Sequence, residues 1–286
     1  MKFSEKITLA QVKLVQEELR AGHKAMAANM VQYALGMPPD IQDEAVGEKF
    51  LREFLNALID EGDYVKAAAL ILAPPFFHPE LESVGRIFSA CNKHDLLLCM
   101  GGSSLGKTFN MVIWCYLQWT RAPEWTSIKL MSQSDKHLTE NLWPHFLKIH
   151  EDCNLKPEGK IRLLDSALWM GMATSTKAYG VSGMAFKQSQ LSSGAWKGLK
   201  VRSARPTSHP NFPKLGSMTR LIILLDEAQQ LPPGVWQDLE SPKASIGNGR
   251  VKIFAAFNPE DVSQPAVKLA EPPGGWHTDQ QETLYS

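Results

Sequence analysis

The sequence predicts an α/β protein with a mostly parallel sheet, preceded by a helical N-terminal region. Two observations point to this fold class. After residue 74, short apolar runs alternate with helical stretches, which is typical of strands buried on both faces of a sheet. Before residue 74, apolar residues recur at helical spacing between glycine and proline breaks. We therefore expect a helical region over residues 1–74 and an α/β domain over residues 75–286.

The helical region starts after Thr8, a residue type that caps helices. The apolar residues that define its first and later helices are Leu9, Val12, Val15, Leu19, Phe50, Phe54, Leu55 and Leu58. Another helical stretch, residues 64–73, ends at Pro74 and Pro75. Pro79 is expected to open a helix that runs to Asn92.

Four apolar runs after the boundary are the expected strands. They cover residues 96–100, 128–131, 221–225 and 251–257. Because parallel strands need long crossover connections, the intervening residues must supply helices, such as the stretch 109–119.

Composition narrows the class of protein further. Of the 286 residues, 44% are hydrophobic and 21% are charged, which fits a globular fold and excludes a disordered chain. The four cysteines form no CxxC pair, so we expect neither a zinc knuckle nor a disulfide scaffold, but a reducing compartment. Without an apolar N-terminal segment or an 18-residue apolar run, the sequence predicts neither secretion nor a membrane span.

Charge is balanced overall but unevenly distributed. The 30 Lys and Arg match the 30 Asp and Glu, so net charge gives no attraction to nucleic acid. Residues 166–225, however, carry 8 basic groups and no acidic group. This stretch predicts contact with a polyanion, and a subunit interface or simple solvation is an equally good interpretation of it.

The strongest motif is a match to G-x-x-x-x-G-K-[ST], the phosphate-binding loop. An apolar run leads into it and a helical stretch follows, as this loop requires. Its backbone N–H groups and the helix N-terminus bind phosphates, Lys107 reaches the β and γ oxygens, and Thr108 is a ligand of Mg²⁺. The loop consists of Gly101, Gly102, Ser103, Ser104, Leu105, Gly106, Lys107 and Thr108. We therefore expect ATP and Mg²⁺ as ligands; an ordinary glycine turn before a helix is the alternative.

Two carboxylates follow the apolar run 221–225 and form the second motif. Ligands of open α/β sheets bind where strands end, so Asp226 is expected to hold Mg²⁺ through water. Glu227 is expected to orient and deprotonate the water that attacks the γ-phosphate. A buried strand that ends in a solvated acidic turn would be the simpler interpretation if the loop motif were absent.

Asn258 follows the last apolar run and is expected at the same sheet edge. An amide there can contact the γ-phosphate or the attacking water. The alternative is a turn, since Asn-Pro pairs such as Asn258-Pro259 commonly open turns.

These three segments, with the phrase RLIILLDEAQQLPPGVW over residues 220–236, resemble the ATPase domain of the large terminase subunit of tailed bacteriophages. The resemblance covers about residues 76–276. It implies a RecA-like P-loop core with helices on both faces of the sheet. It also implies a Mg-dependent ATPase that drives double-stranded viral DNA into a procapsid in the host cell cytoplasm.

The same resemblance implies partners and a missing part. Its partners would be the portal protein and the small terminase subunit, and the chain would form a homo-oligomeric ring when assembled and be a monomer when alone. In the family a nuclease domain follows the ATPase; it is missing from these residues, so we expect the chain to be part of a longer one.

One departure from the family concerns the catalytic cation. Many terminases have an arginine in the loop where this sequence has Ser103. The cation must then come from elsewhere, and Arg202, Arg205 and Arg220 of the carboxylate-free stretch are the candidates. For each one, solvation or DNA-phosphate binding is the simpler interpretation.

Two other functions remain open. The DEAQ segment from Asp226 also resembles a helicase box, although a helicase needs a second lobe for which this chain has no room. A nucleotide-binding regulatory module would have no use for Glu227.

The candidates for contact with the base of the nucleotide are Phe76, Phe77 and Arg86, which precede the loop at a suitable distance along the chain. Two neighbouring aromatic residues are, however, more often part of a hydrophobic core.

Overall fold

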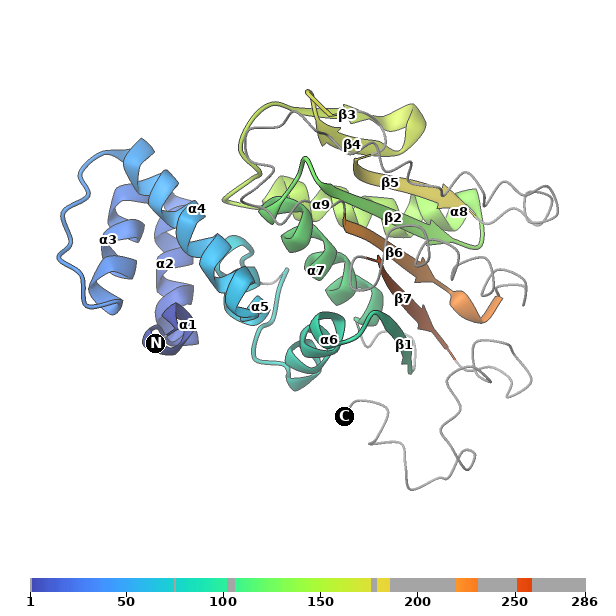
Figure 1. Ribbon diagram of the computed structural model, residues 1–286, viewed down its shortest axis with the longest axis horizontal. Helices are drawn as coiled ribbons and strands as arrows, with labels where there is room; N and C mark the ends of the chain where they lie inside the picture. Colours follow the sequence, from blue (N-terminus) through green and yellow to red (C-terminus); the bar gives the residue numbers. More distant parts are fainter. Residues whose placement is uncertain are drawn as a thin grey trace, which may run out of the picture.

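The computed structural model describes residues 2–74, 76–101, 106–175, 179–185, 220–230 and 251–258. In Figure 1 the N-terminal helices lie on one side of the molecule and the sheet with its helices on the other. The described residues thus form an α/β protein with a helical N-terminal region, in agreement with the predicted fold class.

Five helices occupy the N-terminal region. They are α1 (Phe3–Lys6), α2 (Leu9–Ala21), α3 (Lys24–Ala34), α4 (Glu44–Glu61) and α5 (Tyr64–Ile71). Thr8 begins α2 with a capping box, in which its hydroxyl accepts from Gln11 N–H and the Gln11 side chain accepts from Thr8 N–H. Such a cap is worth about 1 kcal/mol. Helices α2 and α4 both end at a left-handed glycine, Gly22 and Gly62.

Among the described residues the sheet has seven strands, in the order β1-β7-β6-β2-β5-β4-β3. Their bounds are β1 Leu96–Met100, β2 Thr126–Ser132, β3 Ile161–Leu164, β4 Trp169–Met172, β5 Gly180–Ala185, β6 Arg220–Asp226 and β7 Val251–Phe257. The first five in spatial order pair in parallel, and β4 and β3 continue the sheet as antiparallel strands. The four strands predicted from apolar runs are therefore all present.

Three helices build the core against one face of the sheet. They are α6 (Glu82–Lys93), α7 (Lys107–Arg121) and α9 (Trp143–Asp152). Helix α7 is buried almost all round, which explains its run of large apolar residues. The strand residues that join this core alternate along each strand, as Ile222 and Leu224 do in β6. On the other face of β6, Leu221, Ile223 and Leu225 are buried outside this cluster.

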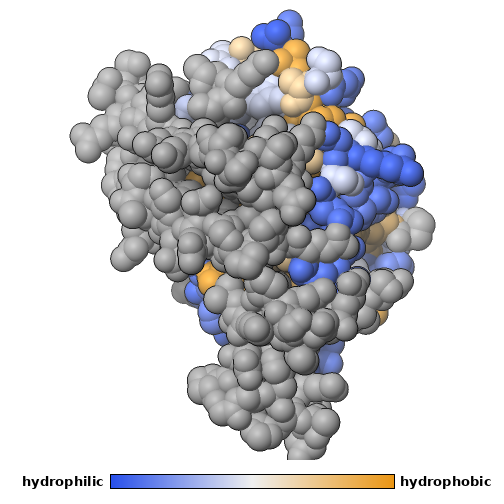
Figure 2. All heavy atoms as spheres, turned by 90° about the vertical axis from the view of Figure 1, so that its right-hand side faces the viewer, coloured by the Kyte–Doolittle hydropathy of each residue, from blue (hydrophilic) through white to orange (hydrophobic). Residues whose placement is uncertain are grey.

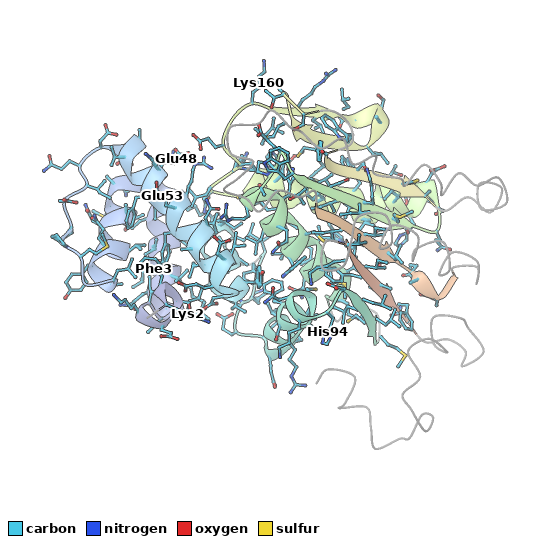
Figure 3. The ribbon with its side chains drawn as sticks, in the orientation of Figure 1. Lys2, Phe3, Glu48, Glu53, His94 and Lys160 are labelled. Atoms are coloured by element: carbon cyan, nitrogen blue, oxygen red, sulfur yellow. The ribbon has the colours of Figure 1, made fainter. Side chains whose placement is uncertain are left out.

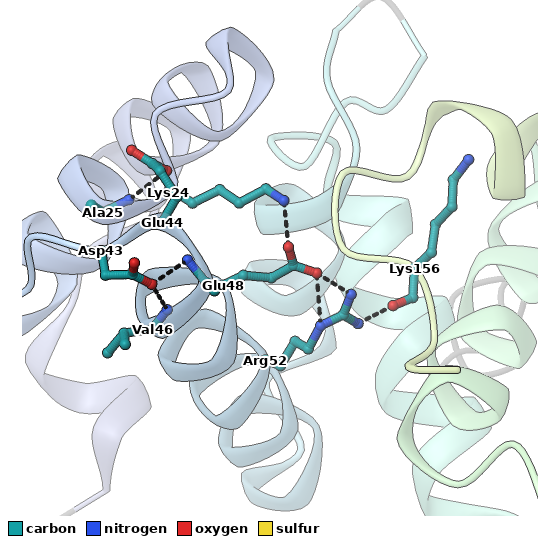
Figure 4. Close-up of polar contacts among 9 residues, drawn as sticks. Lys24, Ala25, Asp43, Glu44, Val46, Glu48, Arg52 and Lys156 are labelled. Atoms are coloured by element: carbon teal, nitrogen blue, oxygen red, sulfur yellow. Dashed lines mark hydrogen bonds and ion pairs between the residues drawn. The ribbon is translucent and has the colours of Figure 1, made fainter. Parts of the chain in front are cut away.

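The N-terminal helices join the same hydrophobic cluster as the sheet, which runs from Ile7 to Ala256. A polar network adds to this contact (Figure 4). Glu48 of α4 accepts from both Lys24 and Arg52, and the Arg52 guanidinium also donates to the Lys156 carbonyl, after α9. These two cations lower the Glu48 pKa. The N-terminal helices and the sheet therefore share one core.

The structure differs from the sequence predictions at two places. Helix α6 begins at Glu82, not at Pro79, and the turns before it take up the intervening residues. The short strands β3, β4 and β5 were not expected. Gly171 weakens the strand pattern of β4, Gly180 and Gly183 weaken that of β5, and β3 has only four residues.

All four cysteines are buried and free. Within the described ranges, no helix combines the length and the apolar character that crossing a membrane requires.

Candidate nucleotide-binding site

Three predicted segments meet at one edge of the sheet. Strand β7 lies between β1 and β6, with Met100 opposite Phe257 and Asp226 opposite Ala256. Gly101, Asp226 and Asn258 therefore follow the carboxyl ends of three adjacent parallel strands. This confirms the prediction that the three strands lie side by side. Figure 2 views the molecule from this side, where the coloured surface is mainly hydrophilic beside a smaller hydrophobic area.

Lys107 begins helix α7 at this edge. Gly106 before it has a left-handed backbone (φ 67°), a conformation that glycine adopts without strain. The Lys107 Nζ donates to the Gly101 carbonyl at 2.7 Å and to Asn258 Oδ1 at 3.2 Å. Lys107 is only 8% exposed, and this burial lowers the pKa of its ammonium. Lys107 and Asn258, two of the predicted site residues, are thus in direct contact.

Thr108 and Asp226 form the second contact between the predicted motifs. The Thr108 hydroxyl donates to Asp226 Oδ1 at 2.6 Å, a short bond of the kind that carboxylates accept. Burial raises the pKa of Asp226, and the Thr108 hydrogen bond opposes that rise. A hydroxyl and a carboxylate oxygen this close are chemically suited to Mg²⁺, which prefers oxygen ligands.

Glu227 has a left-handed backbone with φ 54°. This conformation costs a residue other than glycine about 1–2 kcal/mol, and such strain is concentrated at functional sites. The Gln229 amide donates to Glu227 Oε2 and so restrains the carboxylate. The Glu227 carboxylate thus has a hydrogen-bonding partner of its own and lines the same pocket as Asp226.

These residues line a pocket of about 270 Å³. Its wall consists of Gly106, Lys107, Thr108, Phe109, His137, Asn141, His145, Asp226, Glu227, Ala256, Phe257 and Asn258. The pocket thus brings together an ammonium, two carboxylates, a hydroxyl and two amides at the end of the sheet. Ligands of open α/β proteins bind at this edge.

Sequence reasoning missed one wall of this pocket. His137, Asn141 and His145 come from the helical stretch that follows β2, which comprises α8 (Asp135–His137), η1 (Leu138–Leu142) and α9. Burial lowers the pKa of His145, and nearby Asp226 opposes this shift. Their four-residue spacing was the available signal, because it places side chains on one helical face.

Several predicted site residues are not among the described residues that line the pocket. Gly102, Ser103, Ser104 and Leu105 of the loop, and also Arg202 and Arg205, lie outside the described part of the chain. Arg220 begins β6, six residues before Asp226, so about 20 Å of strand separates their backbones. In its own chain Arg220 therefore starts at the edge opposite the pocket.

The residues considered for the nucleotide base have different environments. Phe77 is 2% exposed and stacks on Phe88, so it belongs to the core. Phe76 makes an edge contact with Phe109, a pocket residue, at 5.1 Å between ring centroids. Arg86 pairs with Glu82 on the surface of α6.

Comparison with known proteins does not assign this chain to a family. No protein-family model matches the chain, and no curated protein is similar to it in sequence. Among the described residues, no group of three His, Cys, Asp or Glu side chains has the proximity of a metal-ligand cluster. Mg²⁺ beside nucleotides is usually held by one or two protein ligands together with phosphate and water oxygens.

Proposed function

We propose that this chain is a Mg²⁺-dependent ATPase with a RecA-like P-loop core. The observation that carries the proposal is the hydrogen bond from Thr108 to Asp226, beside the buried Lys107 ammonium. It joins the end of the loop motif to the end of the acidic strand within one pocket. A chance glycine turn and a chance acidic turn would have no reason to meet in this way.

The pocket residues that come from the predicted motifs each have a chemical task in this proposal. The Lys107 ammonium, which now binds the Gly101 carbonyl and Asn258, would exchange these partners for β and γ phosphate oxygens. Thr108 would hold Mg²⁺ directly and Asp226 would hold it through water. When bound, this ion neutralises the charge that develops on the phosphates.

Glu227 would act as the general base. It would accept a proton from a water molecule as that water attacks the γ-phosphorus in line with the β–γ bridging oxygen, which leaves with ADP. The restraint from Gln229 would keep the carboxylate in place for this transfer. Asn258, bonded to Lys107, would report whether the γ-phosphate is present.

The larger role we propose is that of the motor domain of a terminase large subunit. Hydrolysis would then drive double-stranded DNA into a procapsid, with the portal protein and the small terminase subunit as partners and a ring of this chain as the working form. The sequence resemblance supports this role, and so do the 8 basic and no acidic residues of positions 166–225.

Nucleotide binding and phosphate release test the proposal together. The purified chain should bind a fluorescent ATP analogue in the presence of Mg²⁺ and release phosphate from ATP slowly. Lys107→Ala should abolish binding, whereas Lys93→Ala, in the last turn of α6, should not. Equal binding by the wild type and Lys107→Ala would contradict a P-loop site.

DNA tests the larger role separately from the ATPase. Double-stranded DNA should raise the turnover rate, and the affinity for DNA should fall steeply with salt, because phosphate contacts release counterions. Reversing Lys197 and Lys200 to Glu should weaken DNA binding and leave nucleotide binding intact. ATP turnover without any binding of DNA would leave an ATPase and refute the motor role.

A further inference from the structure

His137 lies against the outer oxygen of Asp226, where no predicted motif places a residue. The His137 Nδ1 is 3.7 Å from Asp226 Oδ2, while the Thr108 hydroxyl binds the other oxygen, Oδ1. The two oxygens of this carboxylate therefore have different neighbours on opposite sides.

Ser132 holds the His137 ring in this place. Its Oγ is 2.7 Å from His137 Nδ1, so the two groups share a hydrogen bond. Ser132 ends β2, which pairs with β6 in a register that sets Met131 beside Leu225. The end of β2 is thereby adjacent to the end of β6, where Asp226 stands.

The local chain explains why His137 faces the sheet. The Ser134 hydroxyl accepts from His137 N–H and begins the helix, which makes His137 a first-turn residue. Helical side chains lean toward the N-terminus, and here this direction leads back to the end of β2. The following η1 is a π-helix, a rare element that is often found at functional sites.

The π-helix also accounts for the row of polar residues on this wall. In an α-helix with 3.6 residues per turn, residues four apart are separated by slightly more than one turn, so their side chains shift around the helix axis. A π-helix has i→i+5 bonds and more residues per turn, which reduces this shift. His137, Asn141 and His145 therefore all reach the pocket, although they span more than two turns.

We propose that His137 is a positioning residue for Asp226, and that Ser132 fixes His137 for this role. The imidazole limits the rotation of the Asp226 carboxylate about its Cβ–Cγ bond, so that Oδ1 stays directed toward Thr108. Partners that orient a metal-binding carboxylate commonly change metal affinity 10–100-fold. The inference rests on the proposed function, since it assigns a consequence for the affinity of the Mg²⁺–nucleotide complex.

The test is the concentration of Mg²⁺ that half-saturates binding of a fluorescent ATP analogue to the full chain. His137→Ala should raise this concentration at least about 10-fold, while the affinity for the analogue in EDTA stays within about twofold of wild type. His137→Asn should recover most of the loss, because the Asn amide nitrogen occupies the position of Nδ1. His137→Gln, whose amide corresponds to Nε2, should not.

Ser132→Ala tests the second contact. It should change the Mg²⁺ requirement in the same direction as His137→Ala, and the double variant should be no worse than His137→Ala alone, because the two residues act through one another. His94→Ala is the matched control. This histidine is exposed and precedes β1, at the sheet edge opposite the pocket (Figure 3).

The outcomes separate the inference from the proposed function. A wild-type chain that binds no nucleotide refutes both. A wild-type chain that binds, together with a His137→Ala chain of unchanged Mg²⁺ requirement, refutes the positioning role alone. An equal loss of affinity in Mg²⁺ and in EDTA, without recovery in His137→Asn, also refutes it, since this is the result of a general structural role.

Discussion

The Thr108 hydroxyl donates a 2.6 Å hydrogen bond to Asp226 Oδ1, and so links two residues 118 positions apart in the chain. The bond spans from the first turn of α7 to the last residue of β6. Strand β7 lies between β6 and β1, the strand that precedes the loop and α7.

Replacing the Thr108 hydroxyl tests that contact. Thr108→Val keeps the shape of the side chain and leaves the buried Asp226 carboxylate without its donor, so we expect the free energy of unfolding to fall by about 1–3 kcal/mol. Affinity for ATP should fall more in Mg²⁺ than in EDTA. Denaturant unfolding and fluorescence titration measure the two effects.

Thr108→Ser is the matched control, because it retains the hydroxyl. It should stay close to wild type in both measurements. A Thr108→Val chain with wild-type affinity in Mg²⁺ would show that the hydroxyl has no part in binding the metal–nucleotide complex.

The packing of α4 against α3 gives a prediction about stability alone. A methyl group added at Gly47 would lie 2.7 Å from the Lys24 carbonyl oxygen and 2.8 Å from Ala25 Cα, both backbone atoms. Gly47→Ala should therefore destabilise the chain by about 1–3 kcal/mol.

Gly85→Ala is its counterpart in α6. The nearest atom to an added methyl there is Val65 Cγ2 at 4.0 Å, which is ordinary contact. This change should be neutral, or stabilising by up to about 1 kcal/mol, because alanine favours helix. Equal effects of the two changes on thermal unfolding would refute the close approach of the two helices.

His150 predicts how stability depends on pH. Its ring nitrogen Nδ1 bonds to the Tyr116 hydroxyl at 3.1 Å, and burial lowers the His150 pKa from 6.5 to about 4. The unfolded chain therefore binds this proton first as pH falls. The contribution of neutral His150 is complete above pH 6.5, is lost progressively as pH falls toward about 4, and changes little below that.

The difference between wild type and His150→Asn isolates this contribution. Asn keeps a polar acceptor near the Tyr116 hydroxyl and does not titrate. Between pH 7 and pH 4.5 the wild type should lose about 1–2 kcal/mol more than the variant, a reduced value because the ring is partly exposed. Parallel loss in both chains would contradict the shift.

The catalytic cation gives a prediction about assembly. If Arg202, Arg205 or Arg220 reaches the site of a neighbouring subunit, specific ATPase activity should rise with protein concentration. An Arg→Ala chain keeps an intact loop and a Lys107→Ala chain keeps an intact arginine. A mixture of these two should regain turnover if the changed arginine is the donor.

Testing each arginine separately identifies the donor. Arg220 is the most informative of the three, because the strand direction keeps its backbone at the edge opposite the pocket of its own chain. Activity strictly proportional to concentration, with no recovery in any mixture, would place the cation within the same chain or in a partner.

The sequence predicted the strands of the site well for a physical reason. Buried parallel strands need continuous apolar runs, and such runs ended at Gly101, Asp226 and Asn258. Ligand binding at the carboxyl ends of strands then predicted their meeting. Both inferences depend on local patterns that any fold of this class must satisfy.

Other features could not be predicted because they depend on tertiary contacts. His137 belongs to a polar stretch that resembles a solvated helix surface, and only the pairing of β2 with β6 brings it to Asp226. The left-handed backbone of Glu227 has no marker in a residue type that rarely adopts it. Strands β3 and β4 pair antiparallel at the sheet edge, where their alternation is too short to distinguish from a loop.

The most direct test of the central claim is a comparison of wild type with Glu227→Gln. The Gln side chain keeps the size of Glu227 and an oxygen that can accept from the Gln229 amide, but it cannot take a proton from water. The account predicts that Glu227→Gln binds ATP with Mg²⁺ as tightly as wild type and releases phosphate at least about 100-fold more slowly in a single-turnover measurement. A Glu227→Gln chain that binds ATP and hydrolyses it at the wild-type rate would contradict the account.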